Sequence, residues 1–596
     1  MEEKKLTGYS SIDKPWLKYY SEEALWAELP TGSMFDYVFR RNAEHPSDIA
    51  LVYYGNKISY RALFEKINRC ASSFTHLGVK KGDVVTIQAI AVPQLVAVLY
   101  ALNKLGACCN MLMPDARAAD VACAMERTQS KLFVVVDKLL STYETEFSDS
   151  FDKPILLINV AEEMGFPARL LAKKKAAYKQ QNSSLSTLTW KKFLALPASE
   201  YTPNHDSDVP AFMVRTGGTT GISKEVVLTS RNFNSVAEAT FYTDMCHGWN
   251  RQHTSVNLLP PFIAFGIGSS LHHPLSFGIT SVIELDISPQ SVGRLFTKYH
   301  PNYVIAGTVQ AEQMMKDLRL LKIDMSPLEL AATGGEAMSK KFEQEYNTFL
   351  KEHNCKVRLT KGYGLTETSA TVIAETIYAN EAGSVGIPIP FCNVKAVDMD
   401  SGEELPYNNE GEIYISSPGL MREYYKNPAA TDEVIVEQDG VRWLRTGDVG
   451  SISQDGLLTI TGRIKRMIVC FENDIYHKVF PKLLEEKLET VDGVSEVAIV
   501  GVADEASANH LAAFIVPEHG CDEAALKERV EGFSAANFET YEQVHEIYIT
   551  EALPKTLIGK VDFRALERKA AENADCREKL TIVSKNSGER KWKKRS

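Results

Sequence analysis

The stretch RTGGTTGISK, residues 215–224, packs three glycines, four hydroxyl side chains and a lysine between two apolar runs. A glycine-rich loop that follows a strand can turn several backbone N–H groups toward one point, and threonine hydroxyls add donors there. The residues before it, Ala211 to Val214, read as the end of such a strand. The stretch therefore predicts an anion cradle in an α/β fold.

This loop differs from the phosphate loop of ordinary NTPases. The pattern G-x-x-x-x-G-K-[ST] does not fit, because Lys224 follows Gly221 by three positions and is itself followed by Glu225. A plain turn between two strands would explain the glycines, but it needs neither the threonines nor the lysine. The loop favours phosphate binding of another kind.

Composition limits the classes of protein that need to be considered. A chain of 596 residues is too long for one core, so two or more domains are expected. A hydrophobic content of 44% and a charged content of 24% are typical of globular proteins. The net charge of −11 argues against nucleic acid as a partner, because a binder needs a basic face to replace counterions.

The cysteines and the apolar segments predict a cytoplasmic protein. Ten cysteines occur without any C-x-x-C pair, which indicates reduced thiols. The N-terminal residues MEEKKLTGYS contain no apolar leader, and the most apolar segment, 84–102, is interrupted by Gln88, Pro93 and Gln94. We therefore expect neither a signal peptide nor a membrane span.

The order of strand-like and helix-like patterns predicts a large layered α/β domain followed by smaller units. Residues 1–464 are expected to form it, with a β-rich subdomain from about residue 383 that contains a hairpin through Asp455-Gly456. Residues 465–570 are expected to form a mobile C-terminal α+β domain, and residues 571–596 a basic, disordered tail. Apolar strand-like runs occur at 49–53, 84–89, 132–136, 255–259, 281–284, 303–306, 328–332, 411–416, 497–502 and 511–516.

Five further polar motifs accompany the opening loop. They are TGGEAM (333–338), KGYGLTET (361–368), RTGD (445–448), TGRIKR (461–466) and PKTLIGKVDFR (554–564). Together with RTGGTTGISK, in this order, they resemble the adenylate-forming superfamily of acyl-CoA synthetases, luciferases and peptide-synthetase adenylation domains. The resemblance runs from about Thr31 to Arg568 and includes GLMREYYKNPAAT at 419–431.

The resemblance implies ATP-dependent activation of a carboxylic acid as an acyl adenylate. Cationic groups and N–H donors must then surround the phosphates in a site poor in water. Thr366 would donate to a phosphate oxygen, and Glu367 would bind Mg²⁺, which prefers carboxylate and phosphate oxygens. The residues implied to hold the β- and γ-phosphates are Thr216, Gly217, Gly218, Thr219, Thr220, Gly221 and Lys224.

The same resemblance assigns the nucleoside and the two domain functions. Tyr363 would stack on adenine, with Gly335, Glu336 and Gly362 as the close backbone around it, and Asp448 and Arg463 would contact the ribose. Lys560 is implied as the catalytic lysine that stabilises charge while the adenylate forms. Lys465 is implied as the hinge about which the C-terminal domain turns, so that coenzyme A can attack.

The segment LPPFIAFGIGS, 259–269, corresponds to the acyl site of the family, with Phe262, Ile263, Ala264 and Gly266 as candidate pocket residues. Amino-acid-activating members place an aspartate where this chain has Ala264. A substrate ammonium group would then lack its counter-charge in a buried site, which is costly. The segment therefore favours a fatty or other apolar carboxylic acid.

Two departures from the family pattern make the second half-reaction, in which coenzyme A takes the acyl group, less well defined than the first, in which the acyl adenylate forms. The opening loop has Gly217, Ser223 and Glu225 where serine, proline and glycine are usual, and a carboxylate near a triphosphate is repelled unless it is paired. The segment 469–478 lacks the usual glycine and is longer than in the family.

The sequence leaves three candidate functions open. The first is a carboxylic acid:CoA ligase that uses ATP, Mg²⁺ and coenzyme A. The second is a stand-alone adenylation enzyme that loads a separate carrier protein. The third is a non-catalytic nucleotide-binding homologue, which Thr366, Glu367 and Lys560 argue against because all three are in place. The identity of the acid and the oligomeric state stay open.

Overall fold

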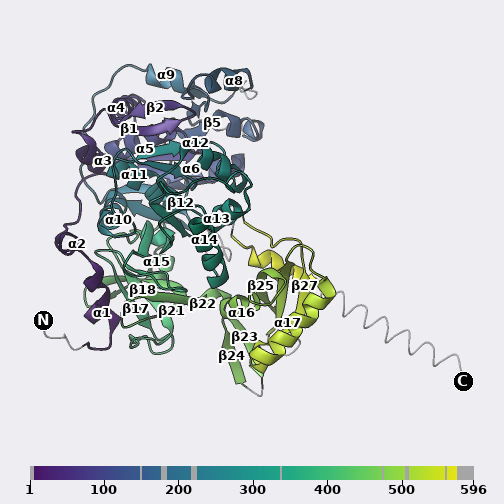
Figure 1. Ribbon diagram of the computed structural model, residues 1–596. Coiled ribbons are helices and arrows are strands. Elements are labelled where there is room, and N and C mark those ends of the chain that lie inside the picture. The colour runs from purple at the N-terminus through teal and green to yellow at the C-terminus, as the bar shows by residue number, and fades with distance from the viewer. Residues whose placement is uncertain are drawn as a thin grey trace, which may run out of the picture.

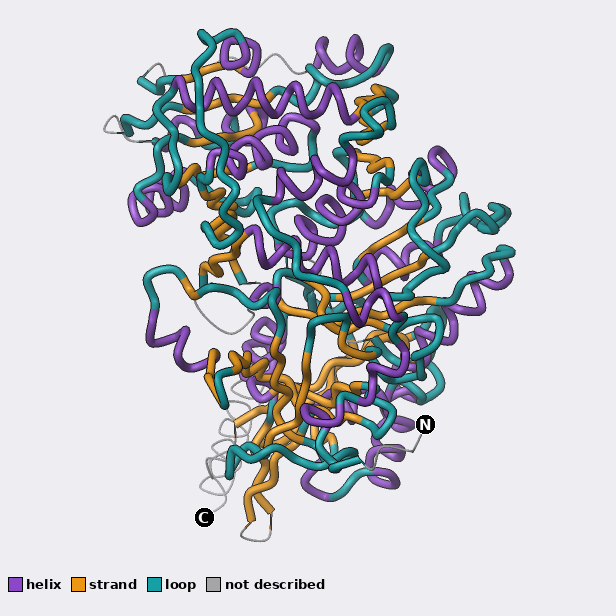
Figure 2. Tube along the Cα trace, turned by 90° about the vertical axis from the view of Figure 1, so that its left-hand side faces the viewer, coloured by secondary structure: helices purple, strands orange, loops and turns teal. Residues whose placement is uncertain are grey.

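The computed structural model describes residues 6–147, 151–175, 184–216, 224–335, 338–472, 475–503, 509–556 and 560–572. Figure 1 shows a large body made by most of the chain, and beside it a smaller body that contains the last described strands and helices. In Figure 2, helices and strands are layered in the upper part, whereas strands dominate the lower part. The mixed α/β class predicted from the sequence is confirmed.

The first large sheet is mostly parallel and has nine strands, with antiparallel strands at both edges. Strand β1 lies next to β11, so that Leu51 is opposite Ser281 although the two are far apart in sequence. The predicted strands at 49–53 and 303–306 coincide with β1 and β12. In spatial order the strands are β16 (Ile387–Pro388), β15 (Ala370–Ala374), β14 (Leu359–Leu365), β13 (Leu330–Gly334), β12 (Tyr303–Ala306), β10 (Thr254–Asn257), β11 (Thr280–Ile283), β1 (Ile49–Tyr53) and β2 (Asn56–Ser59).

The second large sheet has eight strands, and the predicted phosphate loop connects two of them. Its interior strands run parallel, whereas β8, β9 and β19 pair antiparallel. In spatial order the strands are β19 (Glu423–Tyr424), β9 (Glu225–Thr229), β8 (Pro210–Arg215), β4 (Cys108–Met111), β3 (Val84–Gln88), β5 (Phe133–Val136), β6 (Ile155–Ile158) and β7 (Thr187–Thr189).

Helix α5 (Pro93–Leu105) belongs to the core that joins these two sheets. All its residues except Lys104 are buried. A helix that is buried on all sides must pack against other elements on all sides. The cluster around it includes Leu51 of the first sheet and Val85 and Phe212 of the second.

Most of the remaining helices of the large body lie around these two sheets. Among the described residues, no helix is both long and apolar enough to cross a membrane. These helices are α1 (Ser10–Asp13), α2 (Glu22–Trp26), α3 (Met34–Asn42), α4 (Tyr60–His76), α6 (Ala118–Thr128), α7 (Asp137–Leu140), α8 (Ala168–Lys175), α9 (Trp190–Leu194), α10 (Ser230–Tyr242), α11 (His273–Phe277), α12 (Val292–Tyr299), α13 (Thr308–Lys316), α14 (Lys340–Glu352) and α15 (Pro428–Val434).

A five-stranded antiparallel sheet follows, in the region where the sequence predicts a β-rich unit. The predicted hairpin is present: the Ser453 N–H donates to Leu457 O at 2.9 Å, and Gly456 adopts a φ of +88° that favours glycine. The strands are β17 (Asn393–Val397), β18 (Gly411–Ser416), β20 (Ile435–Gln438), β21 (Val441–Ile452) and β22 (Leu458–Arg463).

The C-terminal part has its own sheets and cores. A hairpin precedes a three-stranded sheet, and apolar clusters cover both faces of that sheet. Lys482 Nζ donates to Ile460 O, and Lys341 Nζ lies 3.2 Å from Glu518, so this part contacts the large body. Its elements are β23 (Ile468–Glu472), β24 (Ile475–Val479), α16 (Pro481–Leu488), β25 (Val494–Ala503), β26 (Asn509–Pro517), α17 (Glu523–Asn537) and β27 (Val544–Ile549).

A buried charge cluster braces the antiparallel pair β14–β15. Lys361 Nζ lies 2.6 Å from Glu343 Oε2 and 3.4 Å from Glu375 Oε1, and all three residues are buried. Arg358 adds a second cation beside Glu343. Because Lys361 is shared and lies closer to Glu343, burial dominates at Glu375 and raises its pKa to about 7.

This pKa predicts a pH-dependent stability. An unfolded glutamate has a pKa of about 4.3, so between about pH 5 and 7 the folded state holds a proton that the unfolded chain has released. Stability from this group is therefore lost as the pH rises through 7. In Glu375→Gln, we expect the free energy of unfolding, measured with urea, to fall less between pH 5 and 8 than in the wild type. The exposed Glu410→Gln variant is the control, and an unchanged pH dependence in Glu375→Gln would contradict the assignment.

Candidate functional site

Three of the predicted nucleoside residues meet at one buried carboxylate. The Tyr363 hydroxyl donates to Asp448 Oδ2 at 2.5 Å, and Arg463 Nε donates to Asp448 Oδ1 at 2.5 Å. Strand pairing sets this arrangement, because Asp448 of β21 lies opposite Arg463 of β22. Burial, followed by the Asp448 charge, raises the pKa of Tyr363 well above its ordinary value, so the tyrosine keeps its proton.

The backbone around Tyr363 is close-packed, and glycine is required there. Gly362 pairs with Gly334 across β13 and β14, and a Cβ at Gly362 would lie 2.9 Å from the Thr371 side chain. Gly335 has a φ of +98°, where a side chain would be strained. The remaining predicted member of this group, Glu336, lies outside the described residues.

Thr366 and Glu367 begin the short 3₁₀ turn Thr366–Thr368 that ends β14. The Tyr424 hydroxyl donates to Glu367 Oε1 at 2.6 Å. Lys224 Nζ lies 4.6 Å from the centre of the Tyr424 ring, within the range of a cation–π interaction. Tyr424 thus connects the predicted phosphate-loop lysine to the predicted metal ligand, and its pKa is raised chiefly by burial.

The two ends of the predicted phosphate loop are held together. The Thr216 N–H donates to Lys224 O at 3.0 Å, and the Lys224 N–H donates to Thr216 Oγ1 at 3.2 Å. The residues between them that were assigned to phosphate binding, Gly217, Gly218, Thr219, Thr220 and Gly221, lie outside the described residues, as does Ser223.

The unusual Glu225 is an ion-pairing residue in this structure. Its side chain is buried, forms a hydrogen bond and ion pair with Arg127, and lies 3.6 Å from Arg215. A carboxylate flanked by two cations no longer presents an unpaired negative charge. The repulsion expected between Glu225 and a bound phosphate is offset by Arg127 and Arg215.

Lys560 and Lys465 belong to the C-terminal part and its junction. The Lys560 N–H donates to Thr556 Oγ1, and the Thr556 N–H donates to Lys560 O, which closes a tight bend. Within the described chain, no hydrogen bond or ion pair joins Lys560 to Thr366 or Glu367. Lys465 is exposed in the short turn Ile464–Arg466, directly after β22.

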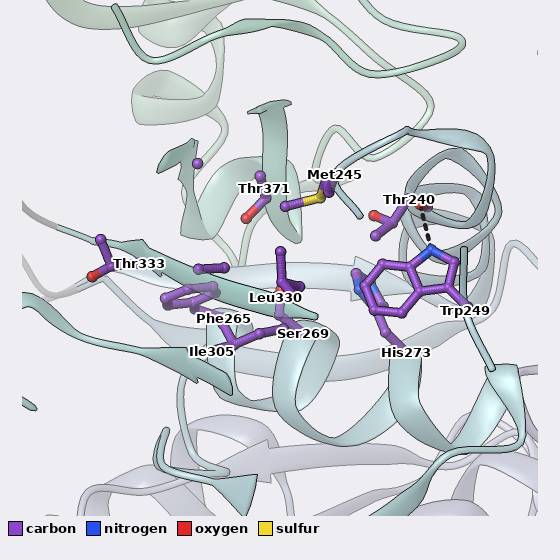
Figure 3. Close-up of a pocket in the computed structure, with 12 residues that line it drawn as sticks. Thr240, Met245, Trp249, Phe265, Ser269, His273, Ile305, Leu330, Thr333 and Thr371 are labelled. Atoms are coloured by element: carbon purple, nitrogen blue, oxygen red, sulfur yellow. Dashed lines mark hydrogen bonds between the residues drawn. The ribbon is translucent and has the colours of Figure 1, made fainter. Parts of the chain in front are cut away.

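A small pocket lies beside this cluster and shares Gly362 with it. In Figure 3, Thr333 lies at one end of the pocket, and Trp249 and His273 lie at the other. Trp249 is held by a 3.3 Å hydrogen bond from its Nε1 to Thr240 O. The lining residues are Thr240, Met245, Trp249, Phe265, Ser269, His273, Ile305, Leu330, Ala332, Thr333, Gly362 and Thr371.

One wall of this pocket comes from the segment that the sequence singled out. Phe265, Ser269 and His273 follow each other at intervals of four residues, along and around a π-helical segment, Gly266–His272. Such segments are rare and occur frequently at functional sites. None of the four residues named from the sequence lines this pocket: Phe262 and Ala264 lie in the core, Ile263 packs against that core, and Gly266 lies against Pro260, where a Cβ would be 1.8 Å from the carbonyl oxygen.

Sequence reasoning did not single out Tyr424, Trp249, His273 or Lys482. Tyr424 lies within the motif GLMREYYKNPAAT, so a signal was present, although its contact with Glu367 depends on the fold. Lys482 is half-buried at the junction, near Asp448, where burial lowers its pKa. Tyr424 and Lys482 are distant in sequence from Glu367 and Asp448, the residues that they approach.

Comparison with known proteins gives two family matches. Residues 38–425 match the AMP-binding enzyme family, and residues 483–560 match the AMP-binding enzyme C-terminal domain. A long-chain-fatty-acid–CoA ligase of Bacillus subtilis is 24% identical over 94% of this chain and 99% of its own length. The 4-coumarate–CoA ligase 1 of Arabidopsis thaliana is 26% identical over 90% of this chain and 93% of its own length.

Solved structures share the fold. ATP-bound MatB from Rhodopseudomonas palustris has a TM-score of 0.75 at 19% identity, covering 91% of this chain and 99% of its own. The anthranilate CoA ligase AuaEII, in complex with anthranoyl-AMP, has a TM-score of 0.76 at 19% identity, covering 93% and 99%. Both likenesses extend over nearly the whole chain.

Proposed function

Because the chain belongs to the AMP-binding enzyme family, we propose that it is an ATP-dependent carboxylic acid:CoA ligase that works through an acyl adenylate. A carboxylate oxygen of the acid attacks the α-phosphorus of ATP, and the bond to the leaving pyrophosphate breaks. The thiolate of coenzyme A then attacks the acyl carbon, and AMP leaves. Two anions meet in the first step, so donors and cations must surround the reacting phosphate.

One observation supports this proposal above the others. The polar cluster of Tyr363, Asp448 and Arg463 and the apolar pocket are adjacent, and Gly362 next to Tyr363 contributes to the pocket wall. A nucleotide held by the first group and an acid held by the second would bring the carboxylate close to the α-phosphate. Such positioning turns a reaction between two molecules into one within a complex.

The described residues also suit the individual roles. Asp448 has lone pairs beyond those used by Tyr363 and Arg463, so it can accept from the two ribose hydroxyls. Lys224 and Thr216, at the ends of the loop 217–223, would hold the outer phosphates together with the N–H groups of that loop.

Glu367 fits the chemistry of Mg²⁺. This ion usually takes one or two protein carboxylates and completes its coordination with substrate phosphates and water, and bound there it would neutralise phosphate charge. Tyr424 orients Glu367 by donating to one oxygen, so the other oxygen is available to a cation.

The second half-reaction is assigned to a rotation of the C-terminal part about Lys465. This exposed residue follows β22, which carries Arg463, and precedes the hairpin β23–β24. A rotation there would move Lys560 and the hairpin relative to the nucleotide. We propose coenzyme A as the thiol, with a carrier protein as the alternative acceptor.

The direct test is mass spectrometry of the products after the protein is incubated with Mg-ATP, coenzyme A and a panel of fatty and aromatic acids. Acyl-CoA and AMP are expected for a subset of the acids. Accumulation of acyl adenylate without acyl-CoA would indicate that the acceptor is a carrier protein and not coenzyme A. ATP binding without acid-dependent release of pyrophosphate would refute the enzymatic proposal.

The role of Lys560 predicts a separation of the two half-reactions. Lys560→Ala removes a cation that stabilises charge as the adenylate forms, so pyrophosphate release should fall by about 10²-fold or more. Thioester formation from supplied acyl adenylate should be retained. The exposed Arg568→Ala variant is the control. An equal loss of both half-reactions in Lys560→Ala would contradict the two-conformation assignment.

The contact between Tyr424 and Glu367 predicts a positioning effect. Tyr424→Phe keeps the buried ring but removes a hydrogen bond to a charged group, typically about 1.5–3 kcal/mol. We expect kcat/KM for adenylation to fall by about tenfold, and the Mg²⁺ concentration needed for half-maximal rate to rise. The neighbouring Tyr425→Phe is the matched control. If both variants retain the wild-type Mg²⁺ dependence, Tyr424 does not position Glu367.

A further inference from the structure

One side chain in the apolar pocket has an unmet capacity for hydrogen bonding. His273 lines the pocket and is 3% exposed, and its buried Nε2 has no hydrogen-bond partner among the described residues. A buried polar group without a partner costs about 1–3 kcal/mol, so it calls for an explanation.

Two other polar side chains that line the pocket are paired within the protein. Thr240 Oγ1 donates to Val236 O at 2.7 Å, and Thr333 Oγ1 donates to Ala306 O at 3.1 Å. The adjacent His272 is bonded on both ring nitrogens, by Tyr100 and Asn234. Of the two unpartnered buried atoms in this stretch of the described chain, Ser270 Oγ and His273 Nε2, only the second belongs to a residue that lines the pocket.

The charge state of His273 limits what it can bind. Burial lowers its pKa to about 3, so the imidazole is neutral at physiological pH, with one donor and one acceptor nitrogen. A neutral ring does not offer an ion pair to a second carboxylate. No lysine or arginine lines the described pocket to replace it. A group bound at this end must be uncharged and capable of hydrogen bonding.

The length of the pocket limits the substrate further. The lining residues of β13 run from Thr333, near the nucleotide cluster, to Leu330 near the other end, which is three residues or roughly 10 Å. In Figure 3, Trp249 lies across the end beyond Leu330. This distance suits an acid with one ring, and it is shorter than an extended long alkyl chain.

We propose that the acid activated by this protein is a short or single-ring carboxylic acid with a neutral hydrogen-bonding substituent, such as a hydroxyl, at the end away from its carboxylate, and that His273 binds this substituent. The inference rests on the proposed ligase activity and deepens it. It makes His273 a specificity-determining residue, while Phe265, Ile305 and Leu330 contact the apolar part of the acid.

The test compares matched pairs of acids with the full-length protein. Pyrophosphate release is measured with Mg-ATP for 4-hydroxycinnamic against cinnamic acid, 4-hydroxybenzoic against benzoic acid, and hexadecanoic acid. In the wild type, kcat/KM should favour the hydroxylated member of at least one pair by about tenfold or more, because the unsubstituted acid leaves the imidazole unpaired. Hexadecanoic acid should be a poor substrate.

Variants connect this preference to the side chain. His273→Leu should bring the ratio for the hydroxylated and unsubstituted acids close to one, and His273→Gln should restore part of the preference. The matched control is His353→Leu, because His353 is also buried with an unpartnered Nε2 but packs against Phe349, away from the pocket. Its ratio should equal that of the wild type.

The outcomes separate this inference from the proposed function. If acids are activated but the hydroxyl has no effect, or if His273→Leu retains the wild-type preference, the assignment of His273 is wrong while the ligase activity stands. A strong preference for hexadecanoic acid would overturn it in the same way. If no acid in any broader panel releases pyrophosphate, the proposed function itself fails.

Discussion

The arrangement of the candidate site depends on one buried carboxylate, Asp448, which accepts from Tyr363 and Arg463. These three residues come from two sheets, since Tyr363 lies on β14 of the nine-stranded sheet and the others on β21 and β22. The contact fixes the antiparallel sheet against the edge of the parallel one. The chain passes from β22 directly into the turn Ile464–Arg466, which contains Lys465 and leads into the C-terminal part.

Much of the fold could be predicted because it depends on local patterns. Apolar runs bounded by turns predicted β1 and β12 at their observed limits, and the pair Asp455-Gly456 predicted the hairpin of β21 and β22. The motif residues Tyr363, Asp448 and Arg463 were also named from the sequence, and they lie together. In each case the information was contained within a few neighbouring residues, or in a resemblance that runs from about Thr31 to Arg568.

The rest could not be predicted because it depends on distances between segments far apart in sequence. Glu225 looked unfavourable beside phosphate until its pairing with Arg127, almost a hundred residues earlier, was known. Tyr424 reaches Glu367 only when β19 is placed beside β9. His273 falls just past the segment associated with the acyl site, at the start of α11 (His273–Phe277), and its place on the pocket wall depends on the π-helical segment that precedes it and on the strands opposite.

The order of strands in the large parallel sheet has a consequence for biosynthesis. Strand β1 finds its parallel neighbour β11 only after about 230 further residues have been made, as the pairing of Leu51 with Ser281 requires. At about 5–20 residues per second on the ribosome, this wait is roughly 10–50 s. During that time one edge of β1 pairs with β2, and the other edge stays unpaired in the nascent chain. Chaperones act on exposed apolar surfaces and unpaired strand edges of this kind. Slower translation between β1 and β11 would therefore lengthen the time for which this strand edge is exposed to aggregation.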